Sequence, residues 1–326
     1  MIQVEKQVNK KGMKQGPQDI ALVLSSGGAR GLAHIGAIEE LISRNYRITS
    51  VTGCSMGALV GGMYAAGRLD DFKQWMCDLD RQKMWKLTDL SFSLTHLMKG
   101  ERIIEAMKDV VPDVDITDLK IPYCAVAADW ETGREIVFRE GSLYEAIRAS
   151  ISMPAVFSPV RRGEMILVDG GVINPLPLSQ AVRGKNELLV AVNVSGPDFE
   201  GRSIKRQKRE EEENRQIEAR LAKKKAIHNP IRRSLSYFPS PSDLLERLRP
   251  DDLSFNYITL IDRAMSIAIK QNAALALQLY KPDIVADIEL ADFDSFDYDK
   301  ARQIINLGKQ SMQQALKTYS QPINNA

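Results

Sequence analysis

The chain has 326 residues, of which 44% are hydrophobic and 26% charged, and its formal net charge is +2. This composition excludes disordered, collagen-like and disulfide-scaffold proteins. The small net charge favours neither a nucleic-acid partner nor a strongly anionic one. The 3 cysteines lack CxxC spacing and fit a reducing compartment, and only 3 histidines are available to a histidine-dependent mechanism.

Residues 1–18 are predicted to form a flexible tail. They carry several lysines and no apolar core of a secretory signal. The longest uncharged stretch, Ile48–Gly67, has the length of a membrane span but is interrupted by glycines, serines and threonines. We therefore expect a buried strand that turns into a buried helix, a cytoplasmic location and, at most, peripheral membrane contact.

From Ile20 onward, strand-like and helix-like segments alternate. Ile20–Leu24 is a continuous apolar run, typical of a strand that is covered on both faces. A predicted helix follows, with one apolar face that comprises Leu32, Ile35, Ile38, Leu41 and Ile42. Further strands are predicted over 48–52, 122–128, 136–138, 165–168 and 188–194. This alternation predicts an α/β fold with a largely parallel sheet and helices on both faces.

The composition changes near Glu200. Residues 200–250 are predicted to be a charged insert or linker, because residues 200–233 carry many charges of both signs and few apolar residues, and prolines interrupt the stretch up to Pro250. Three elements are predicted after it: a helix over 258–279, a strand over 283–290 and an amphipathic helix over 301–316. We expect residues 251–326 to complete the same domain as residues 19–199.

The strongest local motif is Gly53-Cys54-Ser55-Met56-Gly57, a GxSxG pattern between a predicted strand and a helix of small residues. The flanking glycines allow a tight turn, which holds the serine above the sheet edge at the positive end of the helix. GxSxG also occurs by chance in glycine-rich turns, so a simple turn serine is the alternative. The position between strand and helix favours a nucleophile at Ser55.

A second glycine-rich segment, Ser26–Gly31, follows the first predicted strand and opens the first helix. Its backbone amides can converge on one point, as an oxyanion site requires. It lacks the spacing of a dinucleotide fingerprint and the Gly-Lys-Ser/Thr of a phosphate-binding loop. Neighbouring parallel strands would place this loop beside Ser55. The alternative is that the glycines only permit close packing of helix on sheet.

A serine nucleophile needs a base. His34 is predicted to be a core residue, His96 lies in a connection without a motif, and His228 lies in the charged insert. Asp169 is the better candidate, because it follows an apolar strand and begins the motif Asp-Gly-Gly. It would have to lie ~2.6–3.2 Å from the serine hydroxyl, with a pKa raised by burial above about 3.9. An Asx turn is the alternative.

Together these motifs resemble those of the bacterial-type patatin-like phospholipase family. Ser26–Gly31 is similar to the family pattern G-G-G-x-R-G, with Ser26 in place of the first glycine. The GxSxG and D-G-G motifs match at Ser55 and Asp169, and Ala149–Pro159 is similar to a further family block. The resemblance covers about residues 20–194.

The resemblance implies a patatin-like three-layer α/β/α sandwich with a catalytic core over 19–199 that hydrolyses acyl esters of lipids. Ser55 would be the nucleophile that forms an acyl-enzyme, and Asp169 would be the general base. The implied oxyanion residues are Gly27, Gly28, Ala29, Arg30 and Gly31, and the supporting glycines are Gly53, Gly57, Gly170 and Gly171. Arg30 is expected mainly to fix the loop. No metal or other cofactor is implied.

Other interpretations stay open at the level of sequence. An acyltransferase or acyl-CoA thioesterase would use the same acyl-enzyme. A Ser–His–Asp hydrolase would need a histidine after the acid, and only His228 follows Asp169. A catalytically silent scaffold would bind anionic membrane headgroups through the insert. The expected partners are a lipid or acyl-ester substrate and, at most, an anionic membrane, without nucleic acid. The particular lipid, the oligomeric state and the regulation are not predicted.

An apolar group before residue 91 is interpreted either as a wall of an acyl pocket or as ordinary core. Its members are Trp75, Met76, Met84, Trp85, Leu87 and Leu90. Cys54, next to the serine, is interpreted as a small buried neighbour rather than as a second nucleophile.

Overall fold

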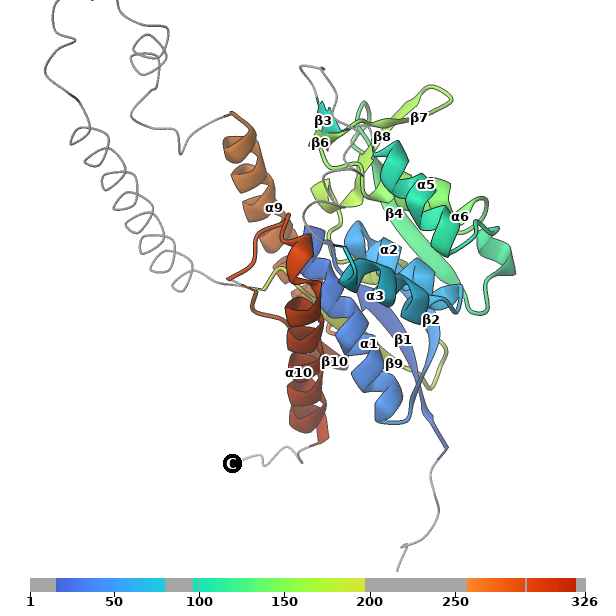
Figure 1. Cartoon of the computed structure of the whole chain (residues 1–326). Helices are drawn as coiled ribbons and strands as arrows, with labels where there is room; N and C mark the ends of the chain where they lie inside the picture. The colour runs from blue at the N-terminus through green and yellow to red at the C-terminus, as the bar shows by residue number, and fades with distance from the viewer. Residues whose placement is uncertain (1–15, 80–95, 99, 197–256, 291, 321–326) are drawn as a thin grey trace, which may run out of the picture.

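The computed structural model describes residues 16–79, 96–98, 100–196, 257–290 and 292–320 (Figure 1). Most of the predicted tail, the whole predicted insert over 200–250 and His228 lie outside these residues. So do Met84, Trp85, Leu87 and Leu90 of the apolar group.

The predicted apolar runs, together with β7, which was not predicted, form a central sheet with the order β10-β9-β1-β2-β4-β8-β7, in which β5 also pairs with β4. The strands are β1 (Gln18–Leu24), β2 (Tyr46–Cys54), β4 (Tyr123–Asp129), β5 (Glu135–Phe138), β7 (Val160–Arg162), β8 (Met165–Asp169), β9 (Leu188–Asn193) and β10 (Ile284–Asp287). A second, two-stranded sheet pairs β3 (His96–Met98) with β6 (Ala155–Phe157).

The prediction of a largely parallel sheet is confirmed for the strands from β10 to β4, which all pair in parallel. The other part of the sheet is antiparallel, because β5 and β8 pair with β4, and β7 with β8, in the opposite direction. The runs that form β5 and β8 are short, and their apolar pattern does not specify a direction.

Helices surround the sheet. They are α1 (Ala33–Ser43), α2 (Met56–Ala65), α3 (Leu69–Cys77), α5 (Glu101–Val110), α6 (Leu143–Ser150), α9 (Tyr257–Tyr280) and α10 (Ala301–Ser320). Short 3-10 helices include η1 (Gly28–Leu32), η3 (Gly170–Val172), η4 (Leu178–Gln180) and η7 (Tyr298–Lys300). Figure 1 shows α1 and α10 packed side by side next to the sheet.

Both faces of the sheet are covered, as the continuous apolar strands predicted. Side chains alternate across a strand, so Leu22 and Leu24 of β1 join the core formed with α1, α2 and α10. Ala21 and Val23 face the other way and pack in a smaller cluster with Leu178 and with Ala273 of α9. The fold is therefore an α/β sandwich of three layers, as the sequence indicated.

The helix predicted over 258–279 is present as α9, but its apolar positions are not a buried face. Leu275 is 60% exposed and Leu279 72% exposed, whereas Ala273 is fully buried. Helical spacing alone does not specify which positions meet the sheet. In α9 the small residue Ala273 makes the close contact with the cluster that contains Ala21 and Val23 of β1.

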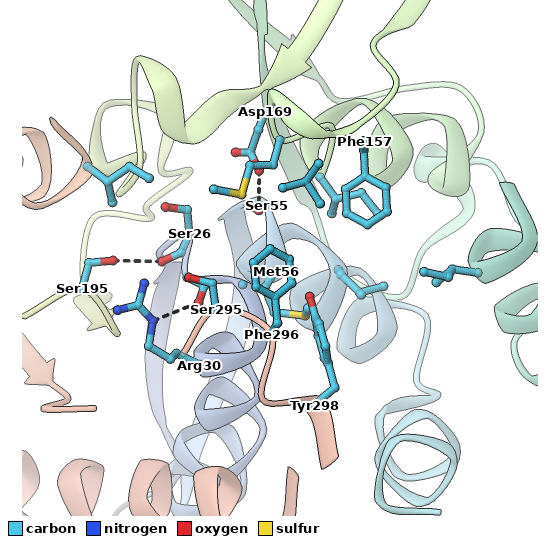
Figure 2. Close-up of a pocket in the computed structure, with 18 of the residues that line it drawn as sticks. Ser26, Arg30, Ser55, Met56, Phe157, Asp169, Ser195, Ser295, Phe296 and Tyr298 are labelled. Carbon is cyan, nitrogen blue, oxygen red and sulfur yellow. Dashed lines mark hydrogen bonds between the residues drawn. The ribbon is translucent and has the colours of Figure 1, made fainter. Parts of the chain in front are cut away.

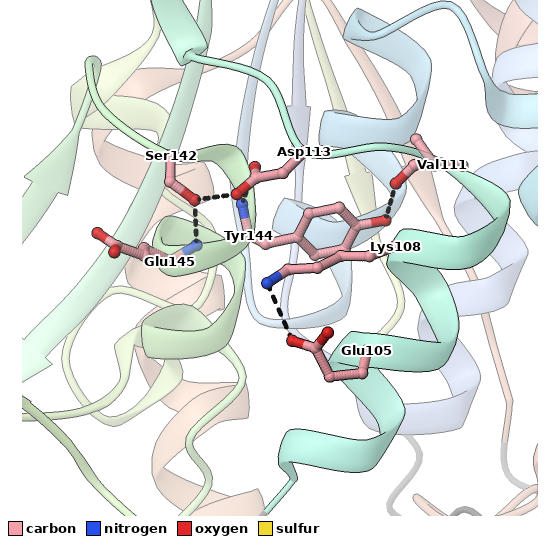
Figure 3. Close-up of polar contacts among 7 residues, drawn as sticks. All are labelled: Glu105, Lys108, Val111, Asp113, Ser142, Tyr144 and Glu145. Atoms are coloured by element: carbon pink, nitrogen blue, oxygen red, sulfur yellow. Dashed lines mark hydrogen bonds and ion pairs between the residues drawn. The ribbon is translucent and has the colours of Figure 1, made fainter.

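Helix α6 connects the surface to the centre of the molecule. At its start the Ser142 hydroxyl caps the helix by accepting the Glu145 amide N–H at 3.1 Å, and it donates to Asp113 Oδ2 at 2.6 Å (Figure 3). The Tyr144 hydroxyl donates to the Val111 carbonyl at 2.8 Å. These contacts hold α6 in place, and its last residue, Ser150, reaches the turn that carries Ser55.

Among the described residues, we find no helix with both the length and the apolar character that crossing a membrane requires.

Candidate active site

Ser55 occupies the sharp turn between β2 and α2. Its backbone has φ 54° and ψ −123°, a conformation that costs a residue with a side chain about 1–3 kcal/mol. Gly57 makes the turn possible, because a Cβ there would collide with the carbonyl oxygen of Leu24. The strand–turn–helix predicted from the GxSxG motif is confirmed, and it raises the serine above the end of the sheet.

The register of the strands brings Asp169 to the level of Ser55. Cys54 pairs with Val126 of β4, and the next residue of β4, Ala127, pairs with Asp169 at the end of β8. One strand thus separates Ser55 from Asp169 in the sheet. Because β8 runs antiparallel to β4, its last residue returns to the edge where β2 ends.

The two side chains are directly hydrogen-bonded (Figure 2). Ser55 Oγ donates to Asp169 Oδ2 at 2.6 Å, and the Gly171 amide donates to the other carboxylate oxygen at 2.7 Å. Ser55 is 8% exposed and Asp169 5% exposed. The predicted proximity of the two residues is confirmed. The Asx-type turn also exists, since the Asp169 carboxylate caps η3 through Gly171.

Burial changes the acidity of the Asp169 carboxyl group. Loss of solvation raises the pKa of Asp169 to about 6, against the opposing hydrogen bonds from Ser55 and Gly171. The carboxylate is therefore a stronger base than an exposed aspartate, while it is still mostly ionised at neutral pH. Burial, followed by the nearby Asp169 charge, raises the pKa of Cys54 well above its ordinary value, so this thiol stays protonated.

Ser150 is a site residue that sequence reasoning missed. Its hydroxyl accepts the Ser55 amide N–H at 2.8 Å and donates to the Val126 carbonyl at 2.6 Å. Ser150 is fully buried. The sequence signal for Ser150 was its position in Ala149–Pro159, the stretch that is similar to a further block of the family. That similarity assigned no role to this serine.

The glycine-rich loop lies beside Ser55, because β1 and β2 are parallel neighbours and Leu24 pairs with Gly53. Gly28 has φ 55°, a conformation that favours glycine. Arg30 Nε donates to the Gly27 carbonyl at 3.3 Å, which agrees with its expected role in fixing the loop. Among the described residues, we find no acceptor for the Gly27 and Gly28 amides.

Ala29 requires a correction to the expected oxyanion set. Its amide N–H donates to the Ser295 carbonyl at 2.8 Å. In this structure that amide is therefore not directed at Ser55. The contact joins segments 266 positions apart in the chain, so no local pattern predicts it.

His34 is buried, as expected of a core residue, and its pKa is lowered to about 4 by desolvation. The neutral ring contacts the Ser25 carbonyl through Nε2 at 2.8 Å, whereas Nδ1 has no partner among the described residues. It makes no hydrogen bond with Ser55 or Asp169 in the described structure. The side chain of His96 lies outside the described residues.

A cavity of about 220 Å³ opens at the Ser55–Asp169 pair. Most of its wall is apolar, and it includes Leu59, Trp75, Met76, Met107, Met153 and Phe157. The described members of the apolar group noted in the sequence, Trp75 and Met76, are therefore cavity wall. Phe296 and Tyr298 contribute to the same wall from the C-terminal part of the chain.

The fold and the site define an α/β protein in which a serine at a strand-to-helix turn is hydrogen-bonded to a buried aspartate. Residues 22–182 match the family described as Patatin-like phospholipase. The chain belongs to the patatin-like phospholipase family, as its motifs indicated.

Individual relatives match over part of their length. An uncharacterized NTE family protein of Mycobacterium tuberculosis is 44% identical over 179 residues, which are 55% of this chain and 50% of that protein. Patatin-like phospholipase domain-containing protein 7 of Rattus norvegicus is 30% identical over 186 residues, which are 55% of this chain and 14% of that protein. The chain spans about half the length of the mycobacterial relative.

Among solved structures, VipD from Legionella pneumophila matches with a TM-score of 0.46 and 14% sequence identity. The match covers 94% of this chain and 67% of that one.

Proposed function

We propose that the protein is a serine hydrolase that cleaves carboxylic esters of lipid-like substrates, with Ser55 as nucleophile and Asp169 as general base. The observation that carries this proposal is the 2.6 Å hydrogen bond from Ser55 Oγ to the buried Asp169 carboxylate. A nucleophile within hydrogen-bond reach of an activated base is the geometry that acyl transfer to serine requires.

In the first half-reaction Ser55 Oγ attacks the ester carbonyl carbon, and its proton passes to Asp169 Oδ2. The amides of Gly27 and Gly28 are the available donors to the negative oxygen of the tetrahedral intermediate. When that intermediate collapses, the proton on Asp169 goes to the leaving alcohol and the acyl group remains on Ser55.

In the second half-reaction Asp169 takes a proton from water, which attacks the acyl-enzyme. Collapse of the second intermediate returns the proton to Ser55 and releases the fatty acid. Asp169 thus serves as base and then as acid in both steps, and the pKa of about 6 keeps it effective near neutral pH.

The shape and lining of the cavity support an acyl chain as the bound group. Its largely apolar wall includes the Ser55–Asp169 pair, and burial of each methylene of a chain contributes about 0.8 kcal/mol. Membership of the patatin-like phospholipase family agrees with a lipid ester as substrate.

Two substitutions test the proposal. Ser55→Ala and Asp169→Asn should each lower hydrolysis of p-nitrophenyl butyrate at least about 10³-fold. The wild type, but not Ser55→Ala, should react with a fluorophosphonate probe, and peptide mapping should find the label on Ser55. Asp118→Asn is the matched control, since Asp118 is exposed and distant in the chain from both motifs. Full activity of Ser55→Ala or of Asp169→Asn would contradict the proposal, and so would a fluorophosphonate label on a serine other than Ser55.

A further inference from the structure

A segment that lies outside residues 22–182 forms part of this site. Residues 292–298, here called the C-terminal strap, lie between β10 and α10, and the last of them, Tyr298, begins η7. Ser295, Phe296 and Tyr298 of the strap line the same cavity as Ser55 and Asp169 (Figure 2). The part of the chain that matches the family therefore does not enclose the cavity by itself.

The strap is docked on the glycine-rich loop. The Ser295 carbonyl accepts the Ala29 amide N–H at 2.8 Å. The contact is close, because a Cβ added to Gly28 would lie 2.7 Å from the same carbonyl oxygen. The strap thus packs directly against the backbone of the loop that precedes α1.

The ends of the strap are anchored in the fold. Phe293 is buried in the main core, and the Lys300 ammonium lies 5.6 Å from the centre of its ring. Lys300 also forms an ion pair with Asp297 at 2.7 Å. These contacts fix the backbone on both sides of Phe296, so its side chain has a defined position at the cavity.

Phe296 and Tyr298 differ in their surroundings. Phe296 lines the cavity and is nevertheless 52% exposed, which places it where the cavity meets solvent. Burial raises the pKa of Tyr298 to about 12, and the charge of Asp169 adds to the shift. The tyrosine hydroxyl is therefore protonated, and Tyr298 lines the same cavity as the Ser55–Asp169 pair.

We propose that Phe296 and Tyr298 are specificity-determining residues, and that the C-terminal strap forms the wall against which the acyl chain of the substrate lies. This inference rests on the proposed function. An acyl chain that reaches the mouth would cover the exposed face of Phe296, and we expect a butyryl group, which is shorter, to bury less of this face. Selectivity for chain length then depends on a segment outside the family match.

The test compares p-nitrophenyl esters of 4-, 8- and 12-carbon acids in Phe296→Ala and the wild type. Because a long chain has more apolar surface to lose against Phe296 than a short one, kcat/KM for the 12-carbon ester should fall about five- to tenfold relative to that for the 4-carbon ester. Phe296→Leu, which keeps an apolar side chain, should restore most of the ratio. Tyr319→Ala is the control, since Tyr319 is also an exposed aromatic residue but does not line this cavity.

An unchanged ratio in Phe296→Ala would overturn the proposal. So would an equal change for all three esters, because that result would make Phe296 a gate or a support of the Ser55–Asp169 pair instead of a wall for the chain.

A second measurement separates this inference from the proposed function. Binding of a fluorescent 12-carbon fatty acid to Ser55→Ala requires no catalysis. Adding Phe296→Ala should weaken this binding about five- to tenfold, even if the wild type proved inactive on every ester. Unchanged binding would refute the role of the strap and leave the Ser55–Asp169 proposal untouched.

Discussion

Replacing Ser150 with alanine should destabilise the fold and also impair ester hydrolysis. The hydroxyl satisfies two backbone groups, the Ser55 N–H at 2.8 Å and the Val126 carbonyl at 2.6 Å. Ser150 is fully buried, so water does not replace these bonds without rearrangement. A buried polar group left without a partner costs about 1–3 kcal/mol, and the two together predict a loss of roughly 2–6 kcal/mol in the free energy of unfolding.

The effect on activity follows from the strained turn. Ser55 is held at φ 54°. In Ser150→Ala, the Ser55 amide lacks the hydrogen bond that resists relaxation of this conformation. A small displacement of the nucleophile from its base costs substantial rate, so kcat should fall at least about tenfold. The pH at which kcat/KM is half-maximal should not fall, because the Asp169 carboxylate stays buried and a weaker hydrogen bond from Ser55 can only raise its pKa.

The assay is urea denaturation followed by circular dichroism, together with hydrolysis of p-nitrophenyl butyrate. Ser142→Ala is the matched control at the opposite end of the same helix (Figure 3). It removes a cap worth about 1 kcal/mol and should leave kcat unchanged. A Ser150→Ala variant with both the wild-type denaturation midpoint and the wild-type kcat would refute the role assigned to this hydroxyl. So would a loss of activity in both variants that is proportional to their loss of stability alone.

Two further predictions concern the buried carboxylate. First, kcat/KM should rise with pH through about 6 and then level off, because the base must be ionised and burial raises the pKa of Asp169 to about 6; a profile that is flat from pH 5 to 8 would contradict this. Second, this raised pKa means that the folded state binds the proton more tightly than the unfolded state, whose value is near 3.8. The contribution of Asp169 to stability is therefore lost as pH rises from about 4 to 6. Asp169→Asn should accordingly be more stable than the wild type at pH 7, by up to roughly 3 kcal/mol, and equal stability at both pH 4 and pH 7 would reject that account.

Much of the framework follows from local sequence patterns. Continuous apolar runs such as Ile20–Leu24 are strands because both faces of the sheet are covered. The turn at Ser55 was predictable because glycines flank it, and the glycine at Gly53 is a local steric requirement: a Cβ there would collide with the backbone of Gly57 in the same turn. Asp169 was identifiable because a strand that ends in Asp-Gly-Gly leaves its carboxylate at the sheet edge, and because the chain offers few histidines.

Other features depend on contacts between distant segments. The antiparallel direction of β8, which returns Asp169 to the level of Ser55, is set by pairing across the sheet and not by the strand's own residues. The exposure of Leu279 shows equally that helical spacing does not specify which face is buried.

The roles of Ser150 and Ser295 were likewise decided by tertiary structure alone. Each contacts a backbone amide that is more than 90 positions away in the chain, that of Ser55 and that of Ala29. A hydrogen bond of this kind depends on where two elements meet in space, and the sequence of either element carries no local trace of it. The sequence by itself therefore determined the candidate nucleophile, the candidate base and the strands beneath them, while the folded chain decided what holds Ser55 in its turn and which C-terminal segment lines the cavity.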